Sequence, residues 1–185
     1  MQLTPNELSA EKKRIRLAIQ LIMNSMTESE RTIRSNSIFE QIEHHDAFIH
    51  AEKVMIFWSL PDEVQTKSFI LKWFTHKNIY LPVIENQQLQ PALFTSEKEL
   101  HTTPPYAIGE PTHRPFLKAK ELDLILVPGL AFYNNYRLGR GKGYYDQFLP
   151  TTQGTRIGLC YSNQILEIPI EPHDAILDEI ITDNY

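Results

Sequence analysis

The sequence predicts an α/β fold: a single-domain, three-layer open sheet, mostly parallel, with helices on both faces and an N-terminal helical arm. Short apolar runs of strand length, such as Val54–Trp58 and Leu122–Val127, alternate with segments whose apolar residues recur at helical spacing. Strands joined by a crossover helix are normally parallel, so helices are expected to cover both faces of the sheet. The 185 residues, 42% hydrophobic and 22% charged, suit one globular domain over residues 1–185.

The first segment carries the signals of a helix start. Thr4 is a suitable N-cap, Pro5 suits the first helical position, and Glu7 completes a capping box. Apolar residues then recur at helical spacing, and Lys12 and Arg16 lie one turn apart on one face. Taken alone, such basic residues usually form a solvated helix face.

The remaining elements follow in order along the chain. We expect a second helix from Thr27 to about His45, a third through Phe69–Phe74 that ends near Asn78, and strands at Val54–Trp58, Ile79–Ile84, Leu89–Phe94, Leu122–Val127, Thr155–Tyr161 and, as an edge strand, Ala175–Ile181. The proline-rich segment Thr102–Pro115 is expected to be an irregular loop, either a static connection or a cover over the site.

Charge and composition argue against several classes of binding partner. The formal net charge of -5 argues against a nucleic-acid partner, because such binding rests on lysine and arginine. The sequence has no signal-peptide pattern and no apolar run of membrane-spanning length, so neither export nor a membrane partner is expected. Cys160 is the single cysteine, which excludes an internal disulfide and fits a cytoplasmic location. No obligatory protein partner is implied.

Glycine is concentrated after the Leu122–Val127 strand. Of the chain's 7 glycines, four lie between Gly129 and Gly143, at the carboxyl end of that strand, where open α/β sheets bind ligands. Glycine lets backbone N–H groups converge on an anion, and a helix that starts near Tyr144 would add the positive end of its dipole.

Charged residues surround these glycines. Arg137, Arg140 and Lys142 supply positive charge, and Asp146 is a natural magnesium ligand beside bound phosphates. The alternative is a glycine-rich turn with solvated basic residues. The spacing excludes two common motifs, because Gly143 stands where a Walker loop needs Ser or Thr, and Tyr144 stands where the dinucleotide fingerprint needs its last glycine.

The stretch VPGLAFYNNYRLGRGKGYYDQFL, Val127–Leu149, resembles the signature of the 5-formyltetrahydrofolate cyclo-ligase family, also called methenyltetrahydrofolate synthetases. Further family blocks come in the family's order at Lys12–Arg16, Pro61–Thr66, Gly109–Pro111 and His173–Thr182. The chain departs from the family pattern at Tyr133–Tyr136, where many members carry Asp and Gly, so we expect an altered loop there.

The resemblance implies a reaction. Family members cyclise 5-formyltetrahydrofolate to 5,10-methenyltetrahydrofolate with ATP and Mg²⁺, and release ADP and phosphate. Phosphorylation turns the formyl oxygen into a leaving group, so that N10 can attack the formyl carbon. Catalysis of such a transfer is mostly positioning and charge neutralisation. The implied partners are therefore ATP and a reduced folate.

The resemblance also implies roles for individual residues. ATP would contact Lys12, Lys13, Arg14, Ile15 and Arg16, and also Arg137, Leu138, Gly139, Arg140, Gly141, Lys142, Gly143, Tyr144 and Tyr145. Catalytic roles fall to Arg140, Lys142 and Tyr144, folate contacts to Trp58, Glu63 and Tyr144, and magnesium ligation to Asp146 and Asp178. For Trp58 a place in the core is an equal alternative, since large aromatic side chains commonly fill cores. Asp178 by itself would be an exposed charge.

Two rival functions remain open at this point. One is a non-catalytic folate- or nucleotide-binding module, against which the pair Asp146 and Asp178 argues. The other is another small α/β enzyme that acts on phosphorylated metabolites, since fold alone does not fix function. It would leave Lys12, Arg16 and Glu63 unexplained.

Overall fold

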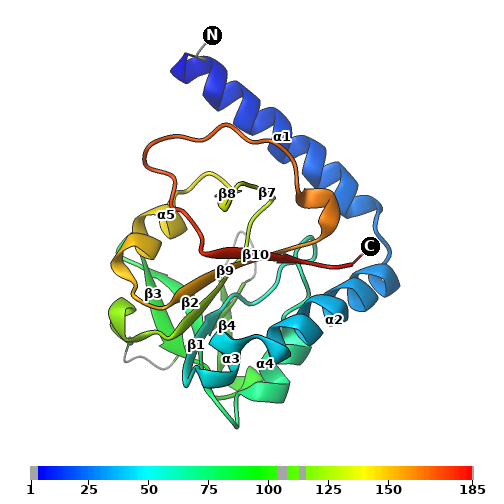
Figure 1. Ribbon diagram of the computed structural model, residues 1–185. Helices are drawn as coiled ribbons and strands as arrows, with labels where there is room; N and C mark the ends of the chain where they lie inside the picture. The colour runs from blue at the N-terminus through cyan, green and yellow to red at the C-terminus, as the bar shows by residue number, and fades with distance from the viewer. Residues whose placement is uncertain (1–3, 104–107, 113–115, 185) are drawn as a thin grey trace.

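The computed structural model describes residues 4–103, 108–112 and 116–184. Its centre is a six-stranded sheet with the strand order β10-β9-β6-β1-β2-β3 (Figure 1). The strands are β1 (Lys53–Ile56), β2 (Asn78–Glu85), β3 (Gln88–Leu93), β6 (Leu124–Val127), β9 (Thr155–Cys160) and β10 (Glu179–Thr182). All neighbours in this sheet are parallel except β2 and β3, which form an antiparallel pair. The predicted mostly parallel sheet is confirmed, with β10 as the expected edge strand.

Two capping boxes start the helical arm as predicted. α1 (Pro5–Ser25) begins after Thr4, whose side chain accepts a hydrogen bond from the Glu7 N–H, while the Glu7 carboxylate accepts one from Thr4. α2 (Glu28–His44) begins in the same way after Thr27. The short helix α3 (Asp46–His50) precedes β1 in the sequence, and the short helix α4 (Lys67–Trp73) follows it. None of the helices in the described part of the chain is both long and apolar enough to cross a membrane.

Alternation along the strands divides the core between the two faces of the sheet. In β1, Val54 and Ile56 belong to one buried cluster and Met55 to the other. The larger cluster includes Ile19 of α1, Ile38 of α2 and Phe69 of α4. The smaller cluster includes Phe148 of α5 (Tyr144–Phe148). Helices therefore cover both faces; α2, α3 and α4 gather on one of them, while α1 lies beside the segment that follows β9 (Figure 1).

The prediction for Thr102–Pro115 was wrong in part. β4 (Leu100–Thr103) and β5 (Ile108–Pro111) form an antiparallel pair in which His101 lies opposite Glu110. Two strands that pair only with each other satisfy their backbone groups without an apolar run, so the periodicity of the segment gives no sign of them. Residues 104–107 and 113–115 lie outside the described part of the chain. The predicted cover over the site falls in part on these residues.

A second hairpin was also missed. β7 (Ala131–Tyr133) and β8 (Tyr136–Leu138) pair through a two-residue turn, in which Asn134 and Asn135 have φ angles of 47° and 63°. Two positive φ angles define the tight hairpin turn that also favours Asp-Gly, and asparagine tolerates this conformation better than most residues. The segment that departs from the family pattern therefore forms a two-residue hairpin turn, and the altered loop that we expected relative to the family stays a prediction.

Candidate active site

Three parallel strands bring their carboxyl ends to one edge of the sheet, and the candidate site lies beyond this edge. β1 leads to residues 60–66, β6 leads to the β7–β8 hairpin and the loop 139–143, and β9 leads to Tyr161. Within the loop, Gly141 and Gly143 have φ angles of 97° and 70°. Most other residues would be strained there, so glycine allows the sharp path from β8 into α5.

Arg16 joins α1 to this loop across 123 residues of sequence. Its Nε donates a hydrogen bond to the Gly139 carbonyl oxygen at 2.8 Å. A Cβ atom on Gly141 would lie 3.5 Å from the Arg16 guanidinium, so this glycine also faces it. The structure thus brings together one helical residue and the loop that the sequence predicts as partners.

Lys12 lies on the same face of α1 but is already paired. Its Nζ lies 2.7 Å from Glu171 Oε2 and 2.9 Å from Asp174 Oδ2, and 10% of its side chain is exposed. Burial alone would lower the pKa of Lys12, but the two carboxylates outweigh this effect, so the pKa is raised overall and the ammonium charge is stabilised. Figure 1 shows the segment after β9, which carries both acids, running beside α1.

The other residues of the basic block point elsewhere. Lys13 is exposed, Arg14 is exposed and pairs with Glu11 at 2.6 Å, and Ile15 is buried in the larger core cluster. The one-turn spacing of an α-helix explains the division, because only residues four apart share the face toward the loop. Lys12 and Arg16 therefore have the contacts that link this block to the site.

Arg140 connects the loop with the turn after β1. Its Nη2 lies 2.6 Å from Asp62 Oδ1 and 3.2 Å from Glu63 Oε1, and its Nε lies 3.4 Å from the same Glu63 oxygen. The side chains are 26%, 16% and 12% exposed for Arg140, Asp62 and Glu63. Burial raises the pKa of Glu63, and Arg140 opposes this rise. Asp62 was missed by sequence reasoning, although it adjoins Glu63 in the same family block.

Arg137 and Tyr145 each carry a buried polar atom that lacks a hydrogen-bond partner within the described part of the chain. The Arg137 guanidinium lies 4.9 Å from the centre of the Tyr145 ring, and its Nη2 lies 3.2 Å from Asp146 Oδ1. Among the described residues, Arg137 Nε and the Tyr145 hydroxyl are buried and make no hydrogen bond. A Cβ atom on Gly139 would lie 2.5 Å from Arg137 Nη1, so a larger residue there would require this guanidinium to move. Unpartnered buried donors beside a glycine loop fit an anionic ligand such as a polyphosphate.

The two predicted magnesium ligands lie in different surroundings. Asp146 uses one carboxylate oxygen for Arg137, whereas both oxygens of Asp178 bind Arg156 at 2.8 to 3.1 Å. Hydrogen bonds from Arg156 lower the pKa of Asp178. Within the described residues, no three His, Cys, Asp or Glu side chains form a group that could hold a metal. Asp146 is therefore the better candidate for a magnesium ligand. Asp178 would first have to lose its hydrogen bonds with Arg156.

The aromatic candidates differ in burial. Trp58 is 9% exposed, packs 5.8 Å from the Phe94 ring centroid, and lies 3.1 Å from where a Cβ on Gly109 would be. It has the contacts of a core residue. Tyr144, at the start of α5, is half-buried and packs against the smaller core cluster, while Lys142 beside it is exposed.

Sequence reasoning missed two further residues, Glu171 and Asp174. Asp174 lies inside the family block at His173–Thr182, but nothing in its spacing from α1 signals that it binds Lys12. Such a contact depends on how the segment after β9 returns across the fold.

Comparisons with known proteins point to one family. The model of the 5-formyltetrahydrofolate cyclo-ligase family matches residues 8–183. A 5-formyltetrahydrofolate cyclo-ligase of Mus musculus is 27% identical over 191 aligned positions, gaps included, and the alignment covers 94% of this chain and 94% of that protein. One of Haemophilus influenzae is 29% identical, with 95% of each chain covered. The NMR structure of Aquifex aeolicus 5,10-methenyltetrahydrofolate synthetase has a TM-score of 0.84 at 26% identity, and covers 94% of this chain and 90% of that one.

The family match spans the loop, the turn that carries Glu63 and the basic face of α1 alike. The chain therefore belongs to the 5-formyltetrahydrofolate cyclo-ligase family, and it is an enzyme of this class of ATP-dependent ligases.

Proposed function

We propose that this enzyme converts 5-formyltetrahydrofolate to 5,10-methenyltetrahydrofolate with ATP and Mg²⁺, through phosphorylation of the formyl oxygen. The observation that carries the proposal is the position of Arg140. Its guanidinium joins the glycine loop, which fits a polyphosphate, to the carboxylates of Asp62 and Glu63, which fit the N–H donors of a pterin. In this proposal, Arg140 links the binding sites of the two substrates that must react.

The chemistry explains the need for ATP. The formyl oxygen attacks the γ-phosphorus, ADP leaves, and the oxygen becomes a phosphate ester. N10 then attacks the formyl carbon and loses its proton, and the oxygen departs with the phosphate. Both steps need negative charge to be neutralised and atoms to be held in line. Arg16, Arg137 and Arg140 supply fixed positive charge around the loop, and Lys142 is exposed beside them.

Glu63 is proposed to bind the folate. A carboxylate accepts hydrogen bonds from the amino and ring N–H groups of a pterin. Burial raises the pKa of Glu63, and the Arg140 charge counteracts this and favours the ionised acceptor. Tyr144 at the loop is the proposed aromatic contact with the pterin. Trp58 packs in the core, so its proposed role in folate binding is secondary.

Magnesium is proposed to bind Asp146, and Asp178 joins it only if Arg156 is displaced. A bound Mg²⁺ neutralises phosphate charge. Lys12 and Arg16 remain the proposed ATP contacts of the basic block because they share one helix face, whereas Lys13 and Arg14 are exposed away from it and Ile15 lies in the core. The single buried free thiol, Cys160, supports a cytoplasmic location.

The test mixes purified protein with 5-formyltetrahydrofolate, ATP and Mg²⁺, and follows the near-ultraviolet absorbance of the methenyl product. Turnover that needs all three components is expected. Failure to form the product with ATP or with another nucleotide would refute the proposal.

A variant pair tests the metal assignment. Asp146→Asn keeps an oxygen for the hydrogen bond with Arg137 but removes the charge, so the fold should persist. We expect it to require much more Mg²⁺ for half-maximal turnover. The control is Asp46→Asn in the short helix α3, which carries no predicted ligand contact. This variant should leave the magnesium dependence unchanged. Equal magnesium dependence of the Asp146 variant and the unaltered enzyme would remove Asp146 from the site.

A further inference from the structure

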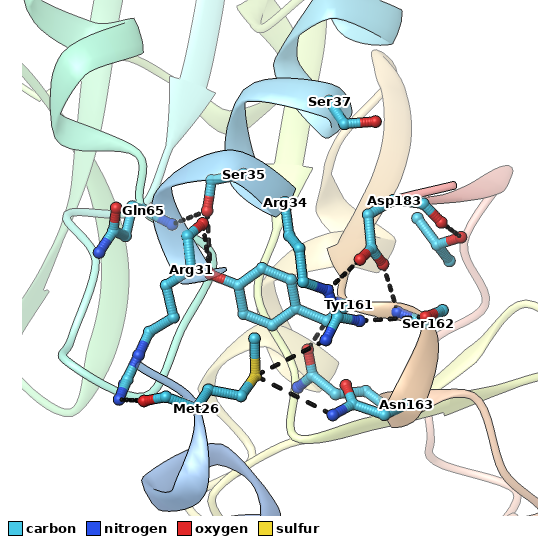
Figure 2. Close-up of polar contacts among 12 residues, drawn as sticks. Met26, Arg31, Arg34, Ser35, Ser37, Gln65, Tyr161, Ser162, Asn163 and Asp183 are labelled. Atoms are coloured by element: carbon cyan, nitrogen blue, oxygen red, sulfur yellow. Dashed lines mark hydrogen bonds and ion pairs between the residues drawn. The ribbon is translucent and has the colours of Figure 1, made fainter. Parts of the chain in front are cut away.

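A buried polar cluster lies where α2 packs against the end of β9 (Figure 2). Tyr161 follows β9 directly and is 0% exposed, and Ser35 of α2 is 1% exposed. Their hydroxyl oxygens lie 2.9 Å apart. Two neutral hydroxyl groups in a core are costly unless each is hydrogen-bonded, so their partners indicate what they hold.

The partners are backbone groups of the turn that carries Glu63. The Tyr161 hydroxyl donates to the Glu63 carbonyl oxygen at 3.3 Å, and the Gln65 N–H donates to Ser35 Oγ at 2.9 Å. Figure 2 shows Gln65 and Tyr161 on either side of Ser35. The turn is therefore fixed on both sides of Val64 by side chains from two distant elements.

The hydrogen bonds form a consistent chain. The Gln65 N–H reaches Ser35 Oγ, the Ser35 hydroxyl proton then reaches the Tyr161 oxygen, and the Tyr161 proton is shared between the carbonyls of Glu63 and Arg31. Each hydroxyl donates once and accepts once, as a hydroxyl can. Movement of the turn would break a member of this chain.

We propose that Tyr161 and Ser35 are positioning residues for folate binding, which hold the turn so that Glu63 meets the pterin. This inference rests on the proposed role of Glu63. Neither hydroxyl is argued to touch the folate. They fix the backbone from which the Glu63 side chain extends, and that side chain also accepts a hydrogen bond from the Leu60 N–H at 2.9 Å.

The other half of the cluster provides a matched control. Arg34 binds the Asp183 carboxylate, and Asp183 Oδ1 accepts a hydrogen bond from the Ser162 N–H at 2.6 Å. These contacts tie α2 to the end of the chain after β10 and involve none of the turn residues (Figure 2). Asp183 is 3% exposed, so a variant there disturbs an equally buried part of the same cluster.

The experiment measures KM for 5-formyltetrahydrofolate, KM for ATP and kcat in Tyr161→Phe, Ser35→Ala and Asp183→Asn, well below the melting temperature of each. We expect KM for the folate to rise about fivefold in the first two, the effect of one lost hydrogen bond, with KM for ATP unchanged. Asp183→Asn should lower the melting temperature but leave KM for the folate unchanged. Ser35→Ala carries the test if Tyr161→Phe does not fold.

A double-mutant cycle with Glu63→Gln separates this inference from the proposed function. Glu63→Gln alone should raise KM for the folate, and Tyr161→Phe should add no further rise in that background, because both act through the same contact. If Glu63→Gln leaves KM unchanged, the folate role of Glu63 is refuted and the inference with it. If Glu63→Gln raises KM but Tyr161→Phe does not, or if Asp183→Asn raises it equally, the positioning role alone is refuted.

Discussion

Replacement of Arg140 by alanine removes the guanidinium that lies between Asp62 and Glu63. Exposed ion pairs contribute about 0–1 kcal/mol, and loss of one partner from a fully buried pair costs about 3–5 kcal/mol. Arg140 keeps 26% of its side chain exposed, whereas its two partners keep 16% and 12%. We therefore expect the variant to lose about 2 kcal/mol of unfolding free energy near neutral pH, between these two limits.

The loss should depend on pH with a definite sign. Burial and the Asp62 charge raise the pKa of Glu63, and Arg140 opposes the rise, so the folded-state pKa rises further in the variant. For a raised carboxyl pKa, the stabilising proton is fully bound below the unfolded pKa and is lost as the pH rises through the folded pKa. The difference in unfolding free energy between the two proteins should therefore grow from acid to alkaline pH.

Urea unfolding measures this difference at about pH 5 and about pH 8. Arg14→Ala is the control, because it removes an exposed pair with Glu11 and should leave stability unchanged at both pH values. The reasoning is refuted if Arg140→Ala is as stable as the unaltered enzyme, or if its loss is equal at the two pH values or larger in acid.

Three further predictions concern the loop and the core. Gly141→Ala should lose about 1–2 kcal/mol of unfolding free energy from backbone strain at φ 97°, since its Cβ would make only an ordinary contact with Arg16; no fall in the melting temperature would contradict this. Tyr145→Phe should not lower the unfolding free energy, because it removes a buried hydroxyl that has no partner among the described residues. A loss above about 1 kcal/mol in urea unfolding would show that the hydroxyl is bonded. Cys160 is buried and burial raises the pKa of its thiol, so the folded protein should resist an aromatic disulfide reagent that modifies the unfolded chain; rapid stoichiometric modification of the folded protein would count against it.

Local patterns predicted the parts of the fold that local physics controls. The capping boxes at Thr4 and Thr27 start α1 and α2, because cap and acid lie within one turn of each other. The short apolar runs became parallel strands, since strands buried on both faces need apolar residues throughout. The β4–β5 pair escaped notice because its stability comes from pairing between two segments of low apolar content.

The site was predicted only as far as its motifs extend. The glycine loop, Arg16 and Glu63 came from sequence, and the structure joins Arg16 to the loop through the Gly139 carbonyl and Glu63 to the loop through Arg140. The basic block at Lys12–Arg16 could not be divided by motif alone, and helix geometry separates its two inward residues from the rest. The magnesium role of Asp146 and Asp178 stays a prediction.

The sequence by itself determined the class of sheet, the glycine loop and the family to which the chain belongs, because each depends on spacing within a short segment. Only the tertiary structure decided which distant polar and charged groups come into contact. Lys12 pairs with Asp174, Arg140 with Asp62, and the Tyr161 hydroxyl with the turn of Glu63, across 162, 78 and 98 residues of sequence. Such pairs depend on where the chain returns in space, and no local periodicity records that return.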